Sequence, residues 1–449
     1  MKRITVKHIL INFVMVNNKF FMSKISNFKF LTKQVLLFVC LFISLKVSGS
    51  YILVPMDFSQ SDHLKAYGIT YWVLENKMTA DWLLNYRGGS FAFQYNKALE
   101  TECVIRGVKY EIVPDGQYSL ILKKIANAEV NQDIIKLEKV PKVAVYSPKF
   151  KLPWDDAVTM VLTYAEIPYD VIYDDEVLLG ELPKYDWLHL HHEDFTGQYG
   201  KFWSAYKNAP WYINQVKDME QLAAKHGFSK VSELKLAVVQ TFKKYVAGGG
   251  FLFAMCSATD TYDIALAGSK TDICAKMFDG DPIEPGAQSK LDFSQTFAFK
   301  NFKISQNPYE YEYSDIDNNA STRKVPKQSD YFSLFEFSAK WDPVPTMLTQ
   351  CHQRTVKGFM GQTTAFRKSV LKSNVLVMGE TKIANEARYI HGTYGYGTWT
   401  FYGGHDPEDY QHFVGDPKTD LSLHPNSPGY RLILNNVLFP AAKKKKQKT

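Results

Sequence analysis

The residues around Cys256 have the pattern of a nucleophile turn. Three glycines at 248–250 end a predicted helix, and the apolar run Phe251–Met255 predicts a short buried strand. Cys256 follows that strand directly, and Ser257 opens the next predicted helix. Exposed N–H groups and the helix dipole favour the thiolate at such a position, and the thiolate is the reactive form of cysteine. The sequence therefore predicts a nucleophilic thiol at the carboxyl end of a strand.

A histidine follows a second predicted strand, Gly397–Tyr402. After two glycines, His405 would project at the same sheet edge as Cys256 and take the thiol proton. Asp406 or Glu408 would orient the imidazole, and backbone N–H groups near Ser257 would stabilise an oxyanion. A turn histidine that caps the following helix is the alternative interpretation of His405.

A third polar group leaves the predicted strand Tyr185–Leu190. Alternation places His189 and the histidine two positions later on one face, and the following residues enter a loop. Imidazole and carboxylate ligands together suit zinc or another divalent ion, and no other cofactor is expected. The cluster from His189 to Asp194 therefore predicts a metal-dependent hydrolase as an alternative function. A hydrogen-bonded polar loop that lines a cleft is the other interpretation. The candidate metal ligands are His189, His191, His192 and Glu193, and the candidate substrate-binding residues are His191, His192, Glu193, Ser257, Thr259 and Asp260.

The first 49 residues have the composition of a secretory signal. They contain eight Lys or Arg and no Asp or Glu, and the apolar run Val35–Leu45 is shorter than the roughly 20 residues that a membrane span needs. We expect residues 1–49 to be a signal peptide, with a start at Met1 or Met22 and cleavage near Gly49 or Ser50. The mature chain is then expected to be periplasmic and to have no transmembrane domain. An uncleaved membrane anchor is the alternative interpretation.

Charge and cysteine content restrict the partners of the mature chain. Without residues 1–49 the formal net charge falls from +7 to −1, which removes the main support for nucleic-acid binding. A small-molecule or carbohydrate ligand is the expected partner, and the lysine-rich residues 441–449 form a solvated tail. Cys274 could pair with Cys256 or Cys351, or be a buried apolar residue; a disulfide at Cys256 would exclude the nucleophile.

The 449 residues are 45% hydrophobic and 14% aromatic, enough for a large core in two or three domains. Strands alternate with helices, which predicts α/β architecture with a mainly parallel sheet. We expect a small α/β unit at 50–140 and a doubly wound, flavodoxin-like domain at 141–440, with a long helical region at 204–247. The rhythm breaks at 277–372, where aromatic runs predict a β-rich insertion placed to form a lid or substrate wall.

The succession of strand, Cys256, helix, later strand and Gly403-Gly404-His405-Asp406-Pro407-Glu408 resembles the class I glutamine amidotransferase-like superfamily. The stretch Tyr396–Glu408 looks most like the ThuA-like branch. The resemblance implies a Cys-His hydrolase acting on an amide or ester, or, on the ThuA-like side, a non-catalytic protein that binds carbohydrate through aromatic residues. Ala254 and Ala258 stand where the superfamily has elbow glycines, which predicts a restricted turn.

The whole chain also resembles an exported family, common in Bacteroidetes, that is often labelled asparagine synthetase B. Enzymes of that activity use an N-terminal cysteine glutaminase and a serine-glycine-rich pyrophosphate loop. Neither motif occurs in this sequence. The motifs therefore do not support the activity in that label.

Overall fold

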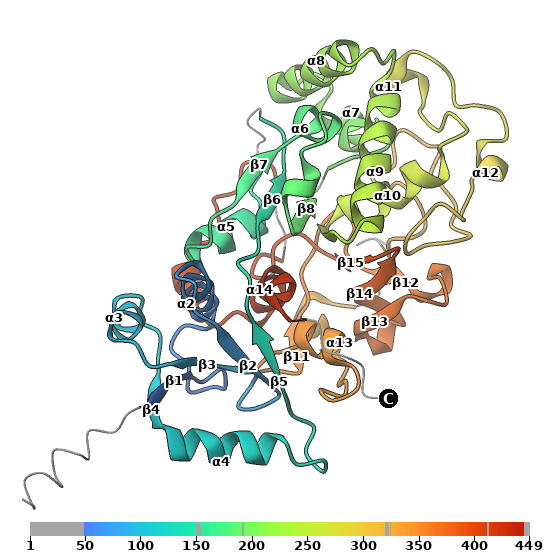
Figure 1. Cartoon of the computed structure of the whole chain (residues 1–449). Helices are drawn as coiled ribbons and strands as arrows, with labels where there is room; N and C mark the ends of the chain where they lie inside the picture. Colours follow the sequence, from blue (N-terminus) through green and yellow to red (C-terminus); the bar gives the residue numbers. More distant parts are fainter. Residues whose placement is uncertain are drawn as a thin grey trace, which may run out of the picture.

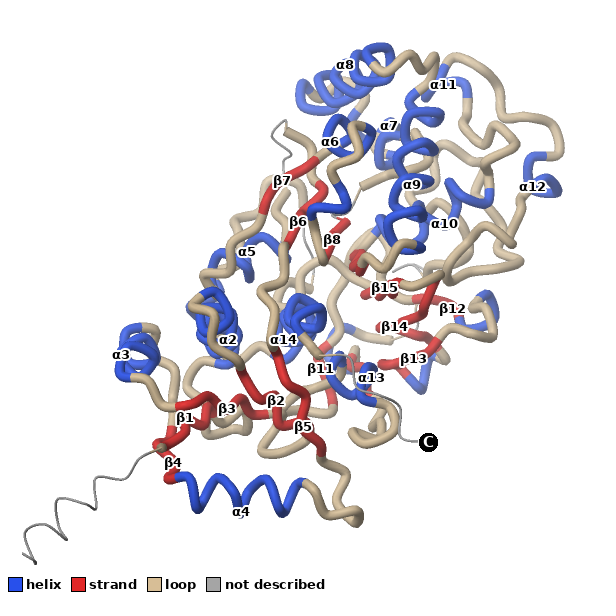
Figure 2. Tube along the Cα trace, in the orientation of Figure 1, coloured by secondary structure: helices blue, strands red, loops and turns tan. Residues whose placement is uncertain are grey.

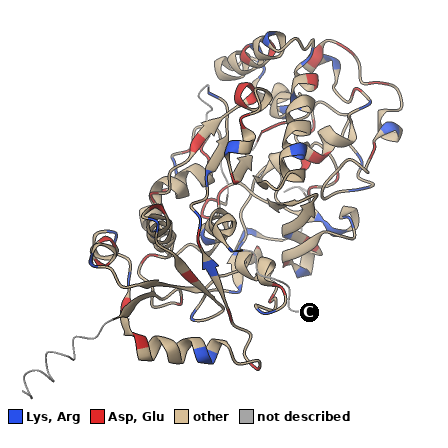
Figure 3. Cartoon of the chain, in the orientation of Figure 1, with Lys and Arg blue, Asp and Glu red and all other residues tan. Residues whose placement is uncertain are grey.

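The computed structural model describes residues 49–149, 154–190, 193–318, 323, 325–410 and 413–443. It is a mixed α/β structure with two β-sheets and helices packed against both (Figures 1 and 2). Residues 1–48 of the predicted signal peptide, His191, His192 and residues 444–449 of the basic tail lie outside the described residues. Within the described part, no helix combines the length and apolar character needed to cross a bilayer. Lys and Arg are interspersed with Asp and Glu over the elements (Figure 3).

The small N-terminal unit is a five-stranded sheet of order β4-β1-β3-β2-β5. Helices α2 and α3 cover one face and α4 the other (Figure 1). All described pairings in this sheet are antiparallel, so the prediction of a mainly parallel sheet here is wrong. The tight turn at 85–89 joins β2 and β3 into a hairpin. Such a short connection can join only antiparallel strands, because parallel strands need a long crossover. The elements are β1 Ser50–Val54, α2 His63–Glu75, β2 Ala80–Leu84, β3 Ser90–Gln94, α3 Lys97–Ile105, β4 Glu111–Pro114, α4 Asp115–Ile125 and β5 Asp133–Leu137.

The large sheet has a parallel half and an antiparallel half. The parallel strands run in the order β7-β6-β8-β9-β15, and β14, β13, β10 and β11 continue the sheet in antiparallel pairs, with β12 beside β14. The parallel strands β6, β8, β9 and β15 are almost entirely buried, as expected of a sheet covered on both faces, whereas the edge strand β7 is largely exposed. The strands are β6 Val143–Tyr146, β7 Asp170–Ile172, β8 Trp187–Leu190, β9 Phe251–Met255, β10 Tyr331–Leu334, β11 Thr355–Lys357, β12 Phe366–Arg367, β13 Leu376–Thr381, β14 Glu386–Tyr394 and β15 Gly397–Tyr402.

Helices pack against both faces of the parallel half. Helices α5 and α14 share one hydrophobic core with one face, and α6, α9 and α10 share a second core with the other. The helical region at 204–247 is not continuous, because Pro210 starts a new helix and Gly227, at φ +79°, follows its end. The helices are α5 Ala157–Tyr164, α6 Asp174–Leu178, α7 Trp203–Tyr206, α8 Pro210–Lys225, α9 Val231–Ala247, α10 Ser257–Ala267 and α14 Pro428–Leu438.

The two sheets are joined by a common core. Helix α14, at the end of the chain, packs against α2 of the small unit, and both belong to one hydrophobic cluster (Figure 1). The backbone amide of Lys443 also donates to the carbonyl of Lys136 in β5, over 2.8 Å. Residues 50–140 are therefore attached to the larger unit by buried side chains and by the chain's C-terminal segment.

The segment 277–372 is less β-rich than predicted. It contains α11 Lys276–Asp279, α12 Ala287–Lys290, α13 Pro343–Leu348 and the short strands β10, β11 and β12, which extend the large sheet. Of its aromatic runs, Tyr331–Phe337 contains a strand, whereas Phe293–Ile304 makes only isolated bridges. The buried carboxylate of Asp263 accepts from the amides of Phe297, Ala298 and Phe299. Those amides are therefore satisfied by a side chain instead of a neighbouring strand.

Candidate active site

Cys256 lies at a strained turn between β9 and α10. Its backbone has φ +55° and ψ −140°, which a residue with a Cβ rarely adopts. The amide and hydroxyl of Thr259 both donate to the carbonyl of Cys256, over 3.1 and 2.6 Å, and hold the first turn of α10. Ala254 and Ala258 are fully buried beside the turn, so alanine does not prevent the conformation that we expected it to restrict. The turn is the geometry from which nucleophiles are presented in α/β hydrolases.

The sulfur of Cys256 faces backbone amides from two segments. The amide of Gln362 donates to Sγ over 3.3 Å, and those of Thr363 and Ser257 also act on the thiol as donors. The loop can approach so closely because residue 361 is glycine. A Cβ at Gly361 would lie 3.1 Å from Sγ and 3.0 Å from the backbone nitrogen of His405. The arrangement is a cradle of N–H groups around the position of a developing negative charge.

Burial dominates the titration of this thiol. Cys256 is 4% exposed, and burial raises its pKa above the ordinary value although the amides of Thr363, Gln362 and Ser257 lower it. The Ser257 amide at the helix N-terminus favours the thiolate, as expected from the sequence, but burial outweighs it. A neutral thiol needs a neighbouring base to become a nucleophile.

His405 reaches the same sheet edge from β15. Strands β9 and β15 are parallel neighbours with Met255 opposite Tyr402, so the chain leaves both strands side by side. Gly404 has φ +100°, and a Cβ there would lie 2.2 Å from the ring of Phe359, so the turn requires glycine. The amide of His405 then donates to the carbonyl of Met360 over 2.9 Å. His405 and Cys256 line one cavity of about 220 Å³.

The carboxylates after His405 have partners of their own. Asp406 is buried and accepts from the Thr419 hydroxyl over 2.7 Å and from the amide of Glu408 over 2.9 Å. Glu408 forms an ion pair with Nδ1 of His424 over 3.3 Å. Asp406 thus fixes the turn that carries His405, and Glu408 is directed toward the segment before α14.

The residues of the first turn of α10 support the elbow. Ser257, Thr259 and Asp260 are each at most 1% exposed. The carbonyl of Ser257 accepts from the hydroxyl of Thr261, and Asp260 accepts from the hydroxyl of Thr363 over 2.9 Å. These hydrogen bonds hold the first turn of α10 and the Thr363 side of the cradle in place.

The described members of the predicted metal cluster have separate surroundings. His189 contacts the carbonyl of Phe253 through Nδ1 and Asp156 through Nε2, within the core shared by α5 and α14. Glu193 lies beside Lys235 and Tyr173, within the core on the other face of the sheet. Burial raises the pKa of Glu193 to about 7. The structure does not bring His189 and Glu193 together.

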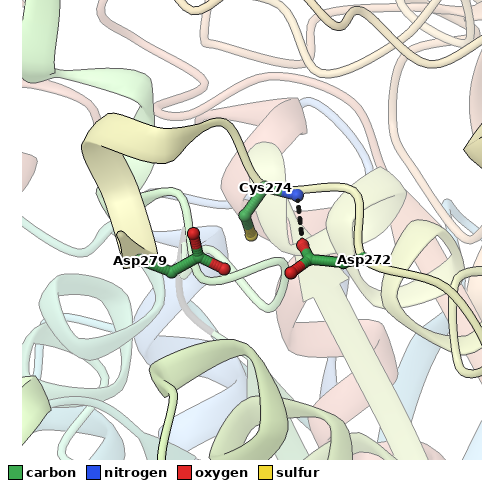
Figure 4. Close-up of side chains that lie close together, drawn as sticks. All are labelled: Asp272, Cys274 and Asp279. Atoms are coloured by element: carbon green, nitrogen blue, oxygen red, sulfur yellow. Dashed lines mark hydrogen bonds between the residues drawn. The ribbon is translucent and has the colours of Figure 1, made fainter. Parts of the chain in front are cut away.

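A different group has the spacing of metal ligands. Ligand atoms of Asp272, Cys274 and Asp279 lie within 4.8 Å of one another (Figure 4). The Lys230 ammonium group already contacts the carboxylates of Asp272 and Asp279, over 2.6 and 3.0 Å. The thiol of Cys274 donates to the carbonyl of Thr196 over 3.1 Å. Both carboxylates are therefore already paired with one lysine side chain, which also contacts Asp281 over 2.9 Å.

The predicted mature cysteines, Cys103, Cys256, Cys274 and Cys351, are all free thiols. Burial raises the pKa of Cys103 to about 12 and that of Cys274 well above its ordinary value. No disulfide blocks Cys256 in the described structure.

Sequence reasoning missed most of the cavity wall. Gln362 ties two wall segments together, because its side-chain amide donates to the carbonyls of Gly200 and Tyr311, over 3.0 and 2.9 Å. Three wall rings pack in succession, with Trp154 5.1 Å and Tyr311 5.9 Å from Phe202 between ring centroids. Gly361, between the apolar pair Phe359-Met360 and the polar residues 362–364, is the local signal that could have marked this loop. The wall residues other than Cys256 and His405 are Trp154, Phe202, Tyr311, Met360, Gly361, Gln362, Phe413 and Val414.

No protein-family model matches the chain, and no curated protein matches its sequence. Among solved structures, the chain is similar to two cytoplasmic proteins from Salmonella typhimurium. The first is 12% identical, and the match covers 68% of this chain and 100% of that chain at a TM-score of 0.34. The second is 14% identical, and the match covers 67% of this chain and 100% of that chain, also at a TM-score of 0.34. A third similar structure is a GH42 beta-galactosidase from G. stearothermophilus, in a catalytic mutant. It is 12% identical, with 59% of this chain and 27% of that chain covered at a TM-score of 0.26.

Proposed function

We propose that this chain is an exported hydrolase in which Cys256 attacks the carbonyl carbon of an amide or ester and His405 transfers the protons. The observation that carries the proposal is the elbow at Cys256, at φ +55°, whose sulfur accepts from the Gln362 amide in a cavity shared with His405. Nucleophilic catalysis by cysteine needs a base, a presented thiol and donors for the oxyanion, and each has a candidate here.

The first half-reaction forms a thioester. His405 accepts the thiol proton, and the sulfur lone pair forms a bond to the carbonyl carbon while the carbonyl π electrons move to oxygen. The amides of Ser257, Gln362 and Thr363 are candidates to hold that oxyanion. Collapse of the tetrahedral intermediate breaks the bond to the amine or alcohol, which leaves with the proton from His405.

The second half-reaction consumes water. His405 removes a proton from a water molecule, whose oxygen attacks the thioester carbonyl. Collapse of this second tetrahedral intermediate breaks the bond between the carbonyl carbon and sulfur, the carboxylic acid product leaves, and the sulfur regains its proton from the imidazolium. Because burial favours the neutral thiol, proton transfer to His405 is needed in every turnover.

The strand order supports membership in the class I amidotransferase-like group. The five parallel strands lie in the spatial order β7-β6-β8-β9-β15. If they are numbered by their position along the chain, this order is 2-1-3-4-5, which is the flavodoxin-like order. Ligands of such sheets bind beyond the carboxyl ends of the strands, where Cys256 and His405 lie. A ThuA-like assignment rests on the residues Tyr396–Glu408 alone, and no motif supports asparagine synthesis.

Turnover by Cys256→Ala and Cys256→Ser tests the proposal. A panel of chromogenic amides and esters is assayed with the wild-type chain, and its best substrate is then used with both variants. We expect either substitution to reduce kcat by roughly 10³-fold or more while the melting temperature changes little. Retained turnover in the alanine variant would falsify the nucleophile assignment.

A second candidate is a non-catalytic protein that binds carbohydrate in the same cavity. The aromatic wall favours it, because Tyr311 and Phe413 line the cavity while remaining 45% and 63% exposed, and aromatic faces suit sugar rings. Thermal stabilisation by an oligosaccharide that is recovered unchanged, in wild type and Cys256→Ala alike, would favour binding over catalysis.

A further inference from the structure

Two buried carboxyl groups grip the loop that supplies amides to Cys256. Oδ1 of Asp317 accepts from the backbone amides of Thr364 and Ala365, over 3.0 and 3.2 Å. Oδ1 of Asp260, in the first turn of α10, accepts from the Thr363 hydroxyl over 2.9 Å. Both side chains are almost fully buried. The loop is thus held at three consecutive residues by carboxyl oxygens from two other segments.

The gripped residues adjoin the amides that face the sulfur. Gln362 donates to Sγ of Cys256 over 3.3 Å, and Thr363, the next residue, is both an amide donor to the thiol and the partner of Asp260. A change of a few tenths of an ångström in this loop would alter both contacts, because hydrogen bonds weaken steeply with distance and angle. Loop position and sulfur stabilisation are therefore coupled.

We propose that Asp317 and Asp260 are positioning residues that set the Gln362 and Thr363 amides on the Cys256 sulfur and, during catalysis, on the oxyanion. The second part of this inference rests on the proposed hydrolase function, and the first does not. Neither carboxyl group has to touch the substrate.

The electrostatic cost of this arrangement argues for a specific role. Burial, with the negative charge of Asp317 nearby, raises the pKa of Asp260 well above its ordinary value. Burial, with Glu312 nearby, raises the pKa of Asp317 to about 7, although the Ala365 and Thr364 amides and Arg323 lower it. Among the described residues, no hydrogen-bond partner satisfies Oδ2 of Asp317. A buried carboxyl that lacks a partner on one oxygen is unfavourable. Its other oxygen fixes two amides of the loop that faces Cys256.

The chain offers a matched control in Asp263. This residue is also buried in α10, and its carboxylate accepts from the three amides of 297–299, in a loop that does not line the cavity. Replacing Asp263 should therefore destabilise the protein in the same manner as replacing Asp317, without moving the amides at Cys256.

The test measures the thiol pKa of Cys256 in the full chain from the pH dependence of iodoacetamide labelling, read by mass spectrometry. Besides burial, the negative charge of the neighbouring Asp260 raises the pKa of Cys256, so removing a carboxyl charge near the thiol by itself lowers that pKa. Asp317→Ala also releases the loop amides, and we expect this larger effect to raise the pKa by about one unit, a tenfold fall in thiolate fraction at fixed pH. Asp317→Asn keeps an acceptor oxygen and should shift the thiolate fraction by less than about threefold. Asp263→Ala should lower the melting temperature as much as Asp317→Ala and leave the thiol pKa unchanged.

An unchanged thiol pKa in Asp317→Ala, or an equal shift in Asp263→Ala, overturns the inference. If Asp317→Ala does not fold, Thr363→Val removes only the hydroxyl that Asp260 holds and should raise the thiol pKa in the same direction; no shift there also overturns it. Turnover separates the two proposals. Loss of turnover in Cys256→Ala with no pKa effect in the aspartate variants would leave the hydrolase and remove the positioning role.

Discussion

The backbone amide of Gln362 donates to the sulfur of Cys256 over 3.3 Å, across a separation of 106 residues. Gln362 belongs to the segment between α13 and β13, whereas Cys256 follows β9. Two segments that are remote in sequence thus form one cradle. Catalysis by this site would depend on the distance between them, which leads to the following predictions.

The thiol of Cys256 is expected to titrate above its ordinary pKa. Burial raises the pKa and outweighs the amides that lower it. Labelling of Cys256 by iodoacetamide should therefore be slow at neutral pH and should rise about tenfold per pH unit until the thiol titrates. Mass spectrometry across pH, with the half-buried Cys351 as internal reference, gives the midpoint. A midpoint well below 8 would mean that a thiolate-imidazolium pair with His405 outweighs burial.

Gly361→Ala is expected to inactivate the site. A Cβ there would crowd both Sγ and the backbone nitrogen of His405, at 3.1 and 3.0 Å, so the loop must move away from the sulfur. We expect turnover to fall by more than about tenfold and the free energy of unfolding to fall by about 1–3 kcal/mol. Gly116→Ala is the control, since a Cβ at Gly116 meets nothing within 4 Å. Equal turnover in the two variants would show that the close approach is not needed.

Asp406 and Glu408 are expected to differ in importance. Asp406 fixes the turn through Thr419 and the Glu408 amide, so Asp406→Ala should reduce kcat by about 10- to 100-fold through misplacement of His405. Glu408→Gln weakens only the ion pair with His424 and should change kcat less than about threefold. Thr419→Val isolates the hydroxyl contact and should lie between them. A larger effect of Glu408→Gln than of Asp406→Ala would assign the orienting role to Glu408.

Acid should destabilise the junction between the small unit and α14. Burial, with Arg431 nearby, lowers the pKa of His63 to about 4, and burial, His63 and Arg431 lower that of His352 to about 3. The rings stack 4.0 Å apart, and Arg431 contacts His352 over 3.3 Å. Both folded pKa values lie below the unfolded value of about 6.5, so unfolding takes up protons at acidic pH. The free energy of unfolding that these histidines contribute is therefore present above pH 6.5 and is lost as the pH falls toward 4 and 3.

Urea unfolding between pH 7 and 4 measures this effect. The His63→Asn variant should lose less stability over that range than the wild type, by on the order of 2 kcal/mol. Glu193 and Asp317, whose pKa values are raised to about 7, act with the opposite sign because unfolding releases their protons. The difference between variant and wild type cancels those contributions. Parallel pH profiles for the two proteins would exclude the histidine effect.

Local patterns were sufficient for several elements of the site. The run Phe251–Met255 with glycines before it gives strand β9, and Gly397–Tyr402 gives β15, both with the bounds expected from sequence. Buried strands and the helix after Cys256 are set by short-range composition, so periodicity and turn residues reveal them. The small unit could not be read in the same way. Alternating strands and helices are compatible with antiparallel pairing, and the turn at 85–89 decides between the two arrangements.

The sequence by itself determined that a thiol follows one strand and an imidazole follows another, because both features depend on neighbouring residues. The tertiary structure decided which strands are adjacent. Strand β9 lies beside β15, although β15 begins 141 positions after Cys256 in the sequence. It also decided that Gln362 and Thr363 face the sulfur, that Asp317 holds their loop, and that His189 and Glu193 lie apart. These relations arise from packing between distant segments, and burial then reversed the expected direction of the Cys256 pKa shift.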